Sequence, residues 1–164
     1  MRKLLVLLMS IVLSITIVLP AYASSEAVTS DVITVSDYTE LIQTDDGGYI
    51  SVTLVSNSVQ TRSTDTKQGE KYVTKYDSDG NVLWVYTLSA SFSYVYGESS
   101  VCTDVTYSVE NNSSIWFFSN GSTEKSGNEA YGYGKFERKL IGLIVLETVN
   151  IDISITCDIY GNLS

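Results

Sequence analysis

The sequence contains no histidine at all. Imidazole is the commonest general base in enzymes and a frequent zinc ligand, so its absence excludes Ser-His-Asp triads, Cys-His dyads and histidine-containing zinc sites. Cysteine occurs only twice, without a Cys-x-x-Cys pair, and no spacing among the 19 acidic residues singles out a catalytic pair. We therefore expect no catalytic residues, no metal site and no cofactor, which favours a protein that is not an enzyme.

Basic residues are also scarce. Ten Lys and Arg stand against 19 Asp and Glu, which gives a formal net charge of −9. Arg2 and Lys3 lie in a predicted export signal, so the mature chain keeps eight basic residues and carries a net charge of −11. Bulk charge of this sign opposes binding to nucleic acid or to anionic lipid, and we expect no nucleic-acid partner.

Residues 1–23 have the features of a signal peptide. A short basic start precedes an apolar run from Leu4 to Leu19, and Ala21-Tyr22-Ala23 fits a small-x-small cleavage site. The alternative is a retained anchor, but a helix of this run would be about 24 Å long, short of the roughly 30 Å hydrocarbon core. We expect cleavage after Ala23, a secreted protein, and no stable membrane insertion of the mature chain.

Proline occurs once, within the signal, and the mature chain alternates apolar and polar residues with a period of two. No segment has the period of a helix. Residues 24–48 are acidic and form either a loose N-terminal arm or one edge strand. Residues 49–164 predict an all-β domain of seven or eight antiparallel strands, packed as a two-sheet β-sandwich in preference to a closed barrel.

The expected strands are 49–60, 70–76, 82–96, 101–109, 115–119, 129–140 and 143–159. Between the second and third, Asp77 and Ser78 favour a turn, and Gly80 can take the positive φ that closes a bulged hairpin. The third strand has large apolar residues on one face and Ser and Thr on the other, so we expect one buried face and one wet face. Residues 120–128 are expected to form a turn cluster.

The two cysteines, Cys102 and Cys157, leave two alternatives open. A disulfide between them would close a loop with 54 residues between its ends and could contribute about 4 kcal/mol. Alternatively, they are two separate small buried or half-buried thiols. Alternation puts Cys157 with isoleucines but Cys102 with polar neighbours, so a β-bulge would be needed to bring both side chains onto one face.

Aromatic residues supply the candidate binding site. The row of the third strand that contains Trp84 and Tyr86 is expected to be core, because large rings bury the most area. Tyr131 and Tyr133 are separated by one glycine and followed by another, so we expect their rings to be uncovered. Tyr96, at the mouth of a loop, is the next candidate. Exposed rings of this kind can stack on sugars, with Ser and Thr rows as hydroxyl partners.

A second candidate surface lies around the apolar run 140–146, which follows Lys135, Arg138 and Lys139. The run is far too short to span a bilayer. It is either a hairpin tip that docks on a surface or partner, or a buried strand pair that turns at Gly142. Burial is the favoured interpretation, because such runs are ordinary in the cores of β-sandwiches.

Three segments carry a resemblance: Tyr76-Asp77-Ser78-Asp79-Gly80-Asn81, Ser126-Gly127-Asn128-Glu129-Ala130-Tyr131-Gly132 and the C-terminal stretch 156–164. In these motifs the chain resembles small exported proteins of anaerobic Gram-positive bacteria. The resemblance covers about half of the chain, and its motifs are turns. It implies a bacterial extracellular protein and assigns a role to no residue.

Together these features predict a secreted, non-enzymatic β-sandwich protein that serves as a binding or surface-interaction module. A carbohydrate-binding module is the more specific version, with a glycan or a cell-surface protein as the partner. The alternative is an exported toxin or competition factor that acts on cell envelopes through the hairpin of residues 135–146. A small hydrolase would instead place two acids in one cleft. Free strand edges could also pair two chains.

Overall fold

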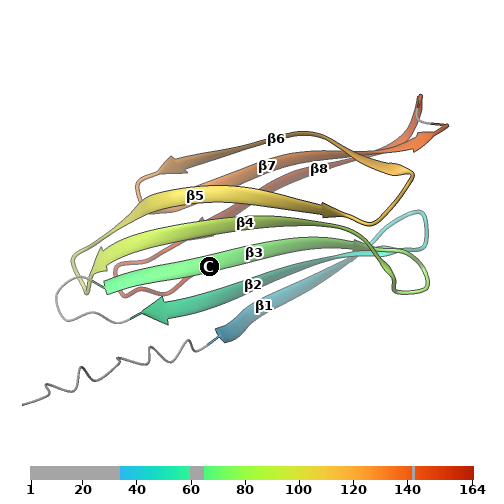
Figure 1. The fold of residues 1–164 in the computed structure, drawn as a ribbon. Helices are drawn as coiled ribbons and strands as arrows, with labels where there is room; N and C mark the ends of the chain where they lie inside the picture. The colour runs from blue at the N-terminus through green and yellow to red at the C-terminus, as the bar shows by residue number, and fades with distance from the viewer. Residues whose placement is uncertain (1–33, 60–64, 142) are drawn as a thin grey trace, which may run out of the picture.

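The computed structural model describes residues 34–59, 65–141 and 143–164, so the predicted signal 1–23 and residues 24–33 lie outside the described residues. The described chain contains eight β-strands and no helix (Figure 1). The strands are β1 Thr34–Gln43, β2 Tyr49–Val59, β3 Asp65–Tyr76, β4 Val82–Val95, β5 Ser99–Asn111, β6 Trp116–Ser126, β7 Glu129–Leu140 and β8 Ile144–Thr156.

The strands form two antiparallel sheets, and within each sheet the strands that pair are consecutive in the chain. The five-stranded sheet has the order β1-β2-β3-β4-β5, and the three-stranded sheet has the order β6-β7-β8. The prediction of an all-β chain with antiparallel strands in two sheets is confirmed. β1 falls within residues 24–48, where an arm and an edge strand were the alternatives, and it is an edge strand paired with β2.

The turn between β3 and β4 is the predicted bulged hairpin. Gly80 has a φ of 84°, and the Asp77 carboxylate accepts hydrogen bonds from the N–H groups of Asp79 (2.9 Å) and Asn81 (2.8 Å). The register between β3 and β4 shifts next to this turn, between Lys75 and Tyr76. The local residues therefore set this turn, as the sequence indicated.

The same turn occurs a second time at the C-terminus, where the sequence repeats the pattern Asp-x-x-Gly-Asn. Asp158 accepts hydrogen bonds from the N–H groups of Tyr160 and Asn162, both at 2.8 Å, and Gly161 has a φ of 81°. The segment folds back so that Cys157 and Leu163 form an isolated bridge. This second turn was not predicted, although both copies share the pattern in the sequence.

Side chains of both sheets meet in one buried core. On β4 every second side chain from Trp84 to Phe92 is buried, as predicted, whereas the intervening residues are partly exposed. The Trp84 ring stacks on Phe136 of the other sheet, with centroids 4.0 Å apart and planes at 8°. The buried hydrophobic residues are Leu54, Val73, Trp84, Tyr86, Leu88, Ala90, Phe92, Cys102, Trp116, Ala130, Phe136, Ile151, Ile155 and Cys157.

Two expected boundaries are wrong by five residues or more, and the last expected strand, 143–159, ends earlier, at Thr156. β3 begins at Asp65, five residues before the expected start, and β6 continues to Ser126, through most of the expected turn cluster 120–128. Only Gly127 and Asn128 remain outside strands there. In both segments the backbone is extended because it pairs with a neighbouring strand, even though most of the side chains are polar and partly or fully exposed.

The favoured interpretation of residues 140–146 is also wrong. Ile141 and Leu143 are 88% and 85% exposed, and the flanking apolar residues are exposed as well. In Figure 1 the β7–β8 hairpin extends beyond the ends of the neighbouring strands. The run is apolar on both faces, but it lies past the region where the two sheets meet, so no facing sheet covers it.

The two cysteines lie in the same core cluster, and they are not bonded to each other. The required bulge is present: the register between β4 and β5 shifts between Ser91 and Phe92, which turns Cys102 inward opposite Phe92. The Cys102 and Cys157 N–H groups donate to the consecutive carbonyls of Gly127 (2.8 Å) and Asn128 (3.0 Å). Burial raises the pKa of both thiols, so neither is a ready nucleophile.

Candidate functional site

The outer face of the three-stranded sheet presents a regular grid of side chains. In one row, Ser122 of β6 lies beside Tyr133 of β7, which lies beside Asp152 of β8. Since successive residues of a strand alternate between faces, the rows two residues away share this face. They are Asn120, Lys135 and Asn150 on one side, and Glu124, Tyr131 and Ser154 on the other.

Two of these rows surround a depression of about 330 Å³. Its side chains on this face combine one ring with amide, hydroxyl, carboxylate and ammonium groups. They are Asn120, Ser122, Tyr133, Lys135, Asn150 and Asp152. The arrangement offers an apolar surface beside both donors and acceptors of hydrogen bonds.

Tyr131 and Tyr133 lie together on this face, and both are half-buried. Gly132, between the two tyrosines, and Gly134, after them, lie on the opposite, inner face, so the glycines do not uncover the rings as the sequence analysis expected. The Tyr131 hydroxyl donates to the Glu129 carboxylate, and this hydrogen bond raises the pKa of Tyr131. Among the described residues, no carboxylate binds the Tyr133 hydroxyl in this way. Tyr133, and not Tyr131, lines the depression.

The inner-face glycines fix the position of this part of β7. The Tyr86 ring occupies the space over Gly134, and its hydroxyl donates to the Tyr133 carbonyl at 3.2 Å. A Cβ at Gly132 would lie 2.9 Å from both the Leu88 Cδ1 and the Tyr86 Oη atoms. Close packing from the five-stranded sheet thus holds the backbone beneath the depression.

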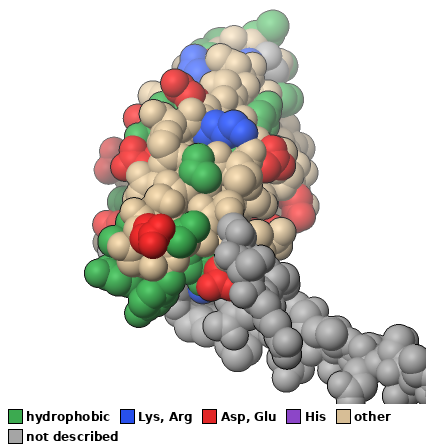
Figure 2. All heavy atoms as spheres, turned by 90° about the vertical axis from the view of Figure 1, so that its left-hand side faces the viewer, with side chains coloured by type: hydrophobic (Ala, Val, Ile, Leu, Met, Phe, Trp, Pro, Cys, Tyr) green, Lys and Arg blue, Asp and Glu red, His purple; other side chains and the backbone are tan. Residues whose placement is uncertain are grey.

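Tyr96, the third predicted residue, is not part of this grid. It lies in the turn between β4 and β5, is 72% exposed, and packs edge-on against Tyr160, with centroids 5.3 Å apart. Figure 2 looks onto this end of the molecule and shows hydrophobic side chains gathered there. The exposed apolar residues of this end include Val95 and Ile159. The structure therefore separates Tyr96 from Tyr131 and Tyr133.

Charges beside the depression are paired. Lys135 Nζ lies 2.7 Å from the Glu137 carboxylate, which also binds Lys139 Nζ at 3.0 Å. Hydrogen bonds from these two lysines lower the pKa of Glu137. Asp152 adds a negative charge on the neighbouring strand. The site therefore lacks the surplus of positive charge that an anionic ligand would need.

A smaller depression of about 170 Å³ lies on the outer face of the five-stranded sheet and includes Glu70 and Asp104. Both Glu70 oxygens are engaged, because one accepts from the Tyr72 hydroxyl and the other from Ser89 Oγ at 3.2 Å. The hydrogen bond to Glu70 raises the pKa of Tyr72 to about 12. Glu70 is thus held by its neighbours as a hydrogen-bond acceptor.

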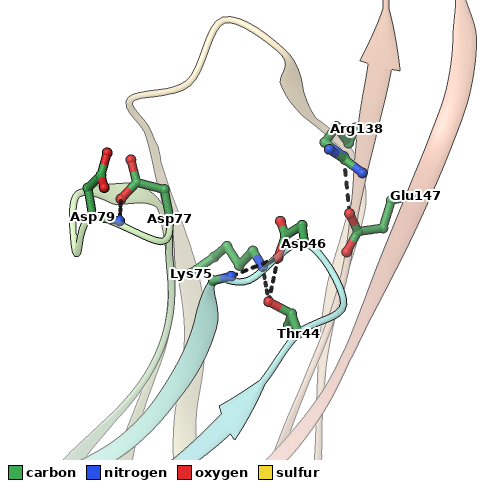
Figure 3. A network of polar contacts seen from close by, with 8 residues as sticks. Thr44, Asp46, Lys75, Asp77, Asp79, Arg138 and Glu147 are labelled. Carbon is green, nitrogen blue, oxygen red and sulfur yellow. Dashed lines mark hydrogen bonds and ion pairs between the residues drawn. The ribbon is translucent and has the colours of Figure 1, made fainter.

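A buried lysine forms another polar cluster, at the opposite end of the core from Tyr96. Lys75 is fully buried, and its Nζ atom donates to Thr44 Oγ1 at 2.5 Å and to Asp46 Oδ1 at 2.8 Å (Figure 3). It lies 6.0 Å from the centroid of the Trp116 ring. The cluster fastens the β1–β2 turn onto the end of the core, which is a structural role.

Within residues 34–59, 65–141 and 143–164, no three His, Cys, Asp or Glu side chains are placed to hold a metal ion. In the same ranges no helix is long and apolar enough to cross a membrane. Sequence analysis missed Asn120 and Ser122 of the depression, because it assigned them to a turn. Asn150 and Asp152 fall within the expected last strand, 143–159, but their register with Tyr133 could not be read from spacing alone.

Scans against protein-family models, curated proteins and solved structures each found no match to this chain.

Proposed function

We propose that the chain is a secreted, non-enzymatic binding module, a two-sheet β-sandwich that binds a neutral glycan in the depression around Tyr133. The observation that carries the proposal is the grid on the outer face of the three-stranded sheet. It places the Tyr133 ring between Ser122 and Asp152, with Asn120 and Asn150 in the next row.

The chemistry of the depression matches a sugar ring. A pyranose has apolar faces that can lie on an aromatic ring, and its hydroxyl groups both donate and accept hydrogen bonds. The carboxylate of Asp152 accepts, the ammonium of Lys135 donates, and the amides of Asn120 and Asn150 do both. A few fixed polar groups around an apolar surface are the usual composition of a small-molecule site.

Charge supports a neutral ligand. Lys135 is already paired with Glu137, at 2.7 Å, and Asp152 faces the same depression. A phosphate, sulfate or carboxylate group would have to displace Glu137 and approach Asp152 in a chain of high negative charge. Neutral hexose polymers therefore fit better than acidic glycans.

The test is a glycan array that carries neutral and acidic glycans, probed with the mature chain and with a Tyr133→Ala variant. We expect the wild-type chain to bind neutral glycans and the variant to lose at least about tenfold in affinity, as for an aromatic side chain at the centre of an interface. A Tyr131→Ala variant should lose less, because its hydroxyl already binds Glu129.

Tyr96→Ala is the matched control, since it removes an exposed tyrosine outside the grid. It should bind as the wild type does, and circular dichroism should give the same spectrum for all variants. The proposed site would be refuted if the wild-type chain bound no glycan on the array, or if only the Tyr96→Ala variant lost binding.

A further inference from the structure

The β7–β8 hairpin ends in an apolar tip that the depression does not use. The run 140–146 contains no charged residue and no hydrogen-bonding side chain. Six of its side chains are between 47% and 88% exposed: Leu140, Ile141, Leu143, Ile144, Val145 and Leu146. Monomeric soluble proteins rarely expose so many contiguous large aliphatic side chains, so such a patch marks an interaction surface.

The exposure is on both faces of the hairpin. Ile144 and Val145 are consecutive in β8 and pair with Leu140 and Lys139 of β7, so their side chains point to opposite faces, and both are exposed. A rigid protein partner that lies against one face would leave the other face in water. A fluid apolar medium that surrounds the tip covers both faces at once.

The backbone at the tip is also unusual. Ile141 has a φ of 52°, in the left-handed region, and the Leu143 N–H donates to the Leu140 carbonyl at 3.2 Å to close the turn. A β-branched residue is disfavoured in that conformation, and Asn, Asp or Gly would fit the turn better. The tip therefore keeps a large aliphatic side chain at its most exposed point against the local preference.

Charged residues form a collar at the base of the tip. Lys139 and Glu147 bound the apolar run on its two sides, and Arg138 lies 3.1 Å from the Glu147 carboxylate. Lys139 Nζ also lies 5.5 Å from the centroid of the Phe117 ring. A hairpin that meets a lipid surface tip first places its apolar residues in the acyl region. The lysine and arginine behind them then lie at the level of the headgroups.

We propose that the tip of the β7–β8 hairpin docks reversibly into the headgroup–acyl boundary of a lipid bilayer. From Lys139 to Ile141 in the turn, two residues on, the hairpin projects about 7 Å, at a rise of about 3.3 Å per residue. This length matches the roughly 5–10 Å to which amphipathic elements enter that boundary. Docking is shallow and peripheral, and it uses a different part of the three-stranded sheet from the proposed glycan site.

The test is co-sedimentation of the chain without residues 1–23, whose own apolar run would bind lipid, with phosphatidylcholine vesicles with or without phosphatidylglycerol. This deletion removes none of the described residues. We expect the wild-type chain to sediment with vesicles and an Ile141→Ser/Leu143→Ser variant to lose about tenfold or more in partitioning. Leu41→Ser, at an exposed leucine of β1, is the matched control and should sediment as the wild type does.

A second measurement reports the tip directly. Trp84 and Trp116 are buried, so a Leu143→Trp variant adds the one exposed indole to the described fold. Its emission should shift to the blue on addition of vesicles, without leakage of an entrapped dye, because docking is shallow. An unshifted spectrum, equal sedimentation of the double variant, equal loss in Leu41→Ser, or dye leakage would each overturn the proposal. Self-association that Ile141→Ser abolishes, with no vesicle binding, would assign the tip to a second copy of the chain.

Discussion

Among single residues, Lys75 is the one whose buried charge depends most on its partners. Its side chain is fully buried, and its ammonium is satisfied by Thr44 and Asp46. Partial burial works to raise the pKa of Asp46, but hydrogen bonds from Lys75, Thr44 and the Gly48 N–H outweigh it and lower the pKa from 3.8 to about 2. Removing one partner of such a pair leaves an uncompensated buried charge, which costs more than the pair contributes.

We predict that Asp46→Asn lowers the free energy of unfolding by about 2–3 kcal/mol at neutral pH. Because the folded-state pKa is depressed, the stabilisation is present above pH 3.8 and is lost as the pH falls toward about 2. Urea denaturation of wild type and variant across this range should therefore give converging stabilities. Asp45→Asn, at the exposed neighbouring acid, is the control. An equal loss in that variant, or a difference that persists at pH 2, would contradict this role.

At the scale of the element, β7 connects the proposed binding face to the core. Its outer face carries Tyr131, Tyr133 and Lys135, and its inner face has glycine at 132 and 134 so that Tyr86 and Leu88 can approach the backbone. The glycines are therefore a packing requirement of the core. They set the depth and position of the strand that forms the floor of the depression.

Gly132→Ala should consequently destabilise the protein by about 1–3 kcal/mol, because the added Cβ would overlap Leu88 and Tyr86. Thermal and urea unfolding measure the loss. Ser122→Ala, on the outer face of the adjacent strand, should change stability by less than about 0.5 kcal/mol. If Gly132→Ala were as stable as Ser122→Ala, the inner-face packing described for β7 would be incorrect.

The sequence predicted some elements well for identifiable reasons. Buried and partly exposed side chains alternate along most of β4 and β7, and Asp77 and Gly80 favour the β3–β4 turn by their local conformation. The expected and observed boundaries of these strands therefore agree to within about one residue. Residues 120–126 were missed because polar, glycine-containing sequence is typical of turns, whereas pairing with β7 makes it a strand. Hydrophobic strands predict burial only where another layer faces them, and the apolar tip has no such layer.

For the whole molecule, the two proposed surfaces share one sheet. β7 and β8 contribute to the depression near their middle and to the apolar tip at one end, whereas Tyr96 lies in the turn between β4 and β5 of the five-stranded sheet. The five-stranded sheet supplies the side chains that support β7 from the inner side, including Trp84 and Tyr86. In the proposed arrangement the larger sheet would be a scaffold, and the smaller sheet would make the contacts with partners.

The most direct test of this arrangement is an NMR titration of the isotope-labelled mature chain with a neutral glycan selected on the array. We expect the amide shift changes to cluster at residues 120–122, 133–135 and 150–152, which the register places side by side. Changes centred instead on Tyr96 and Tyr160, or the absence of any neutral glycan that perturbs the spectrum, would contradict it.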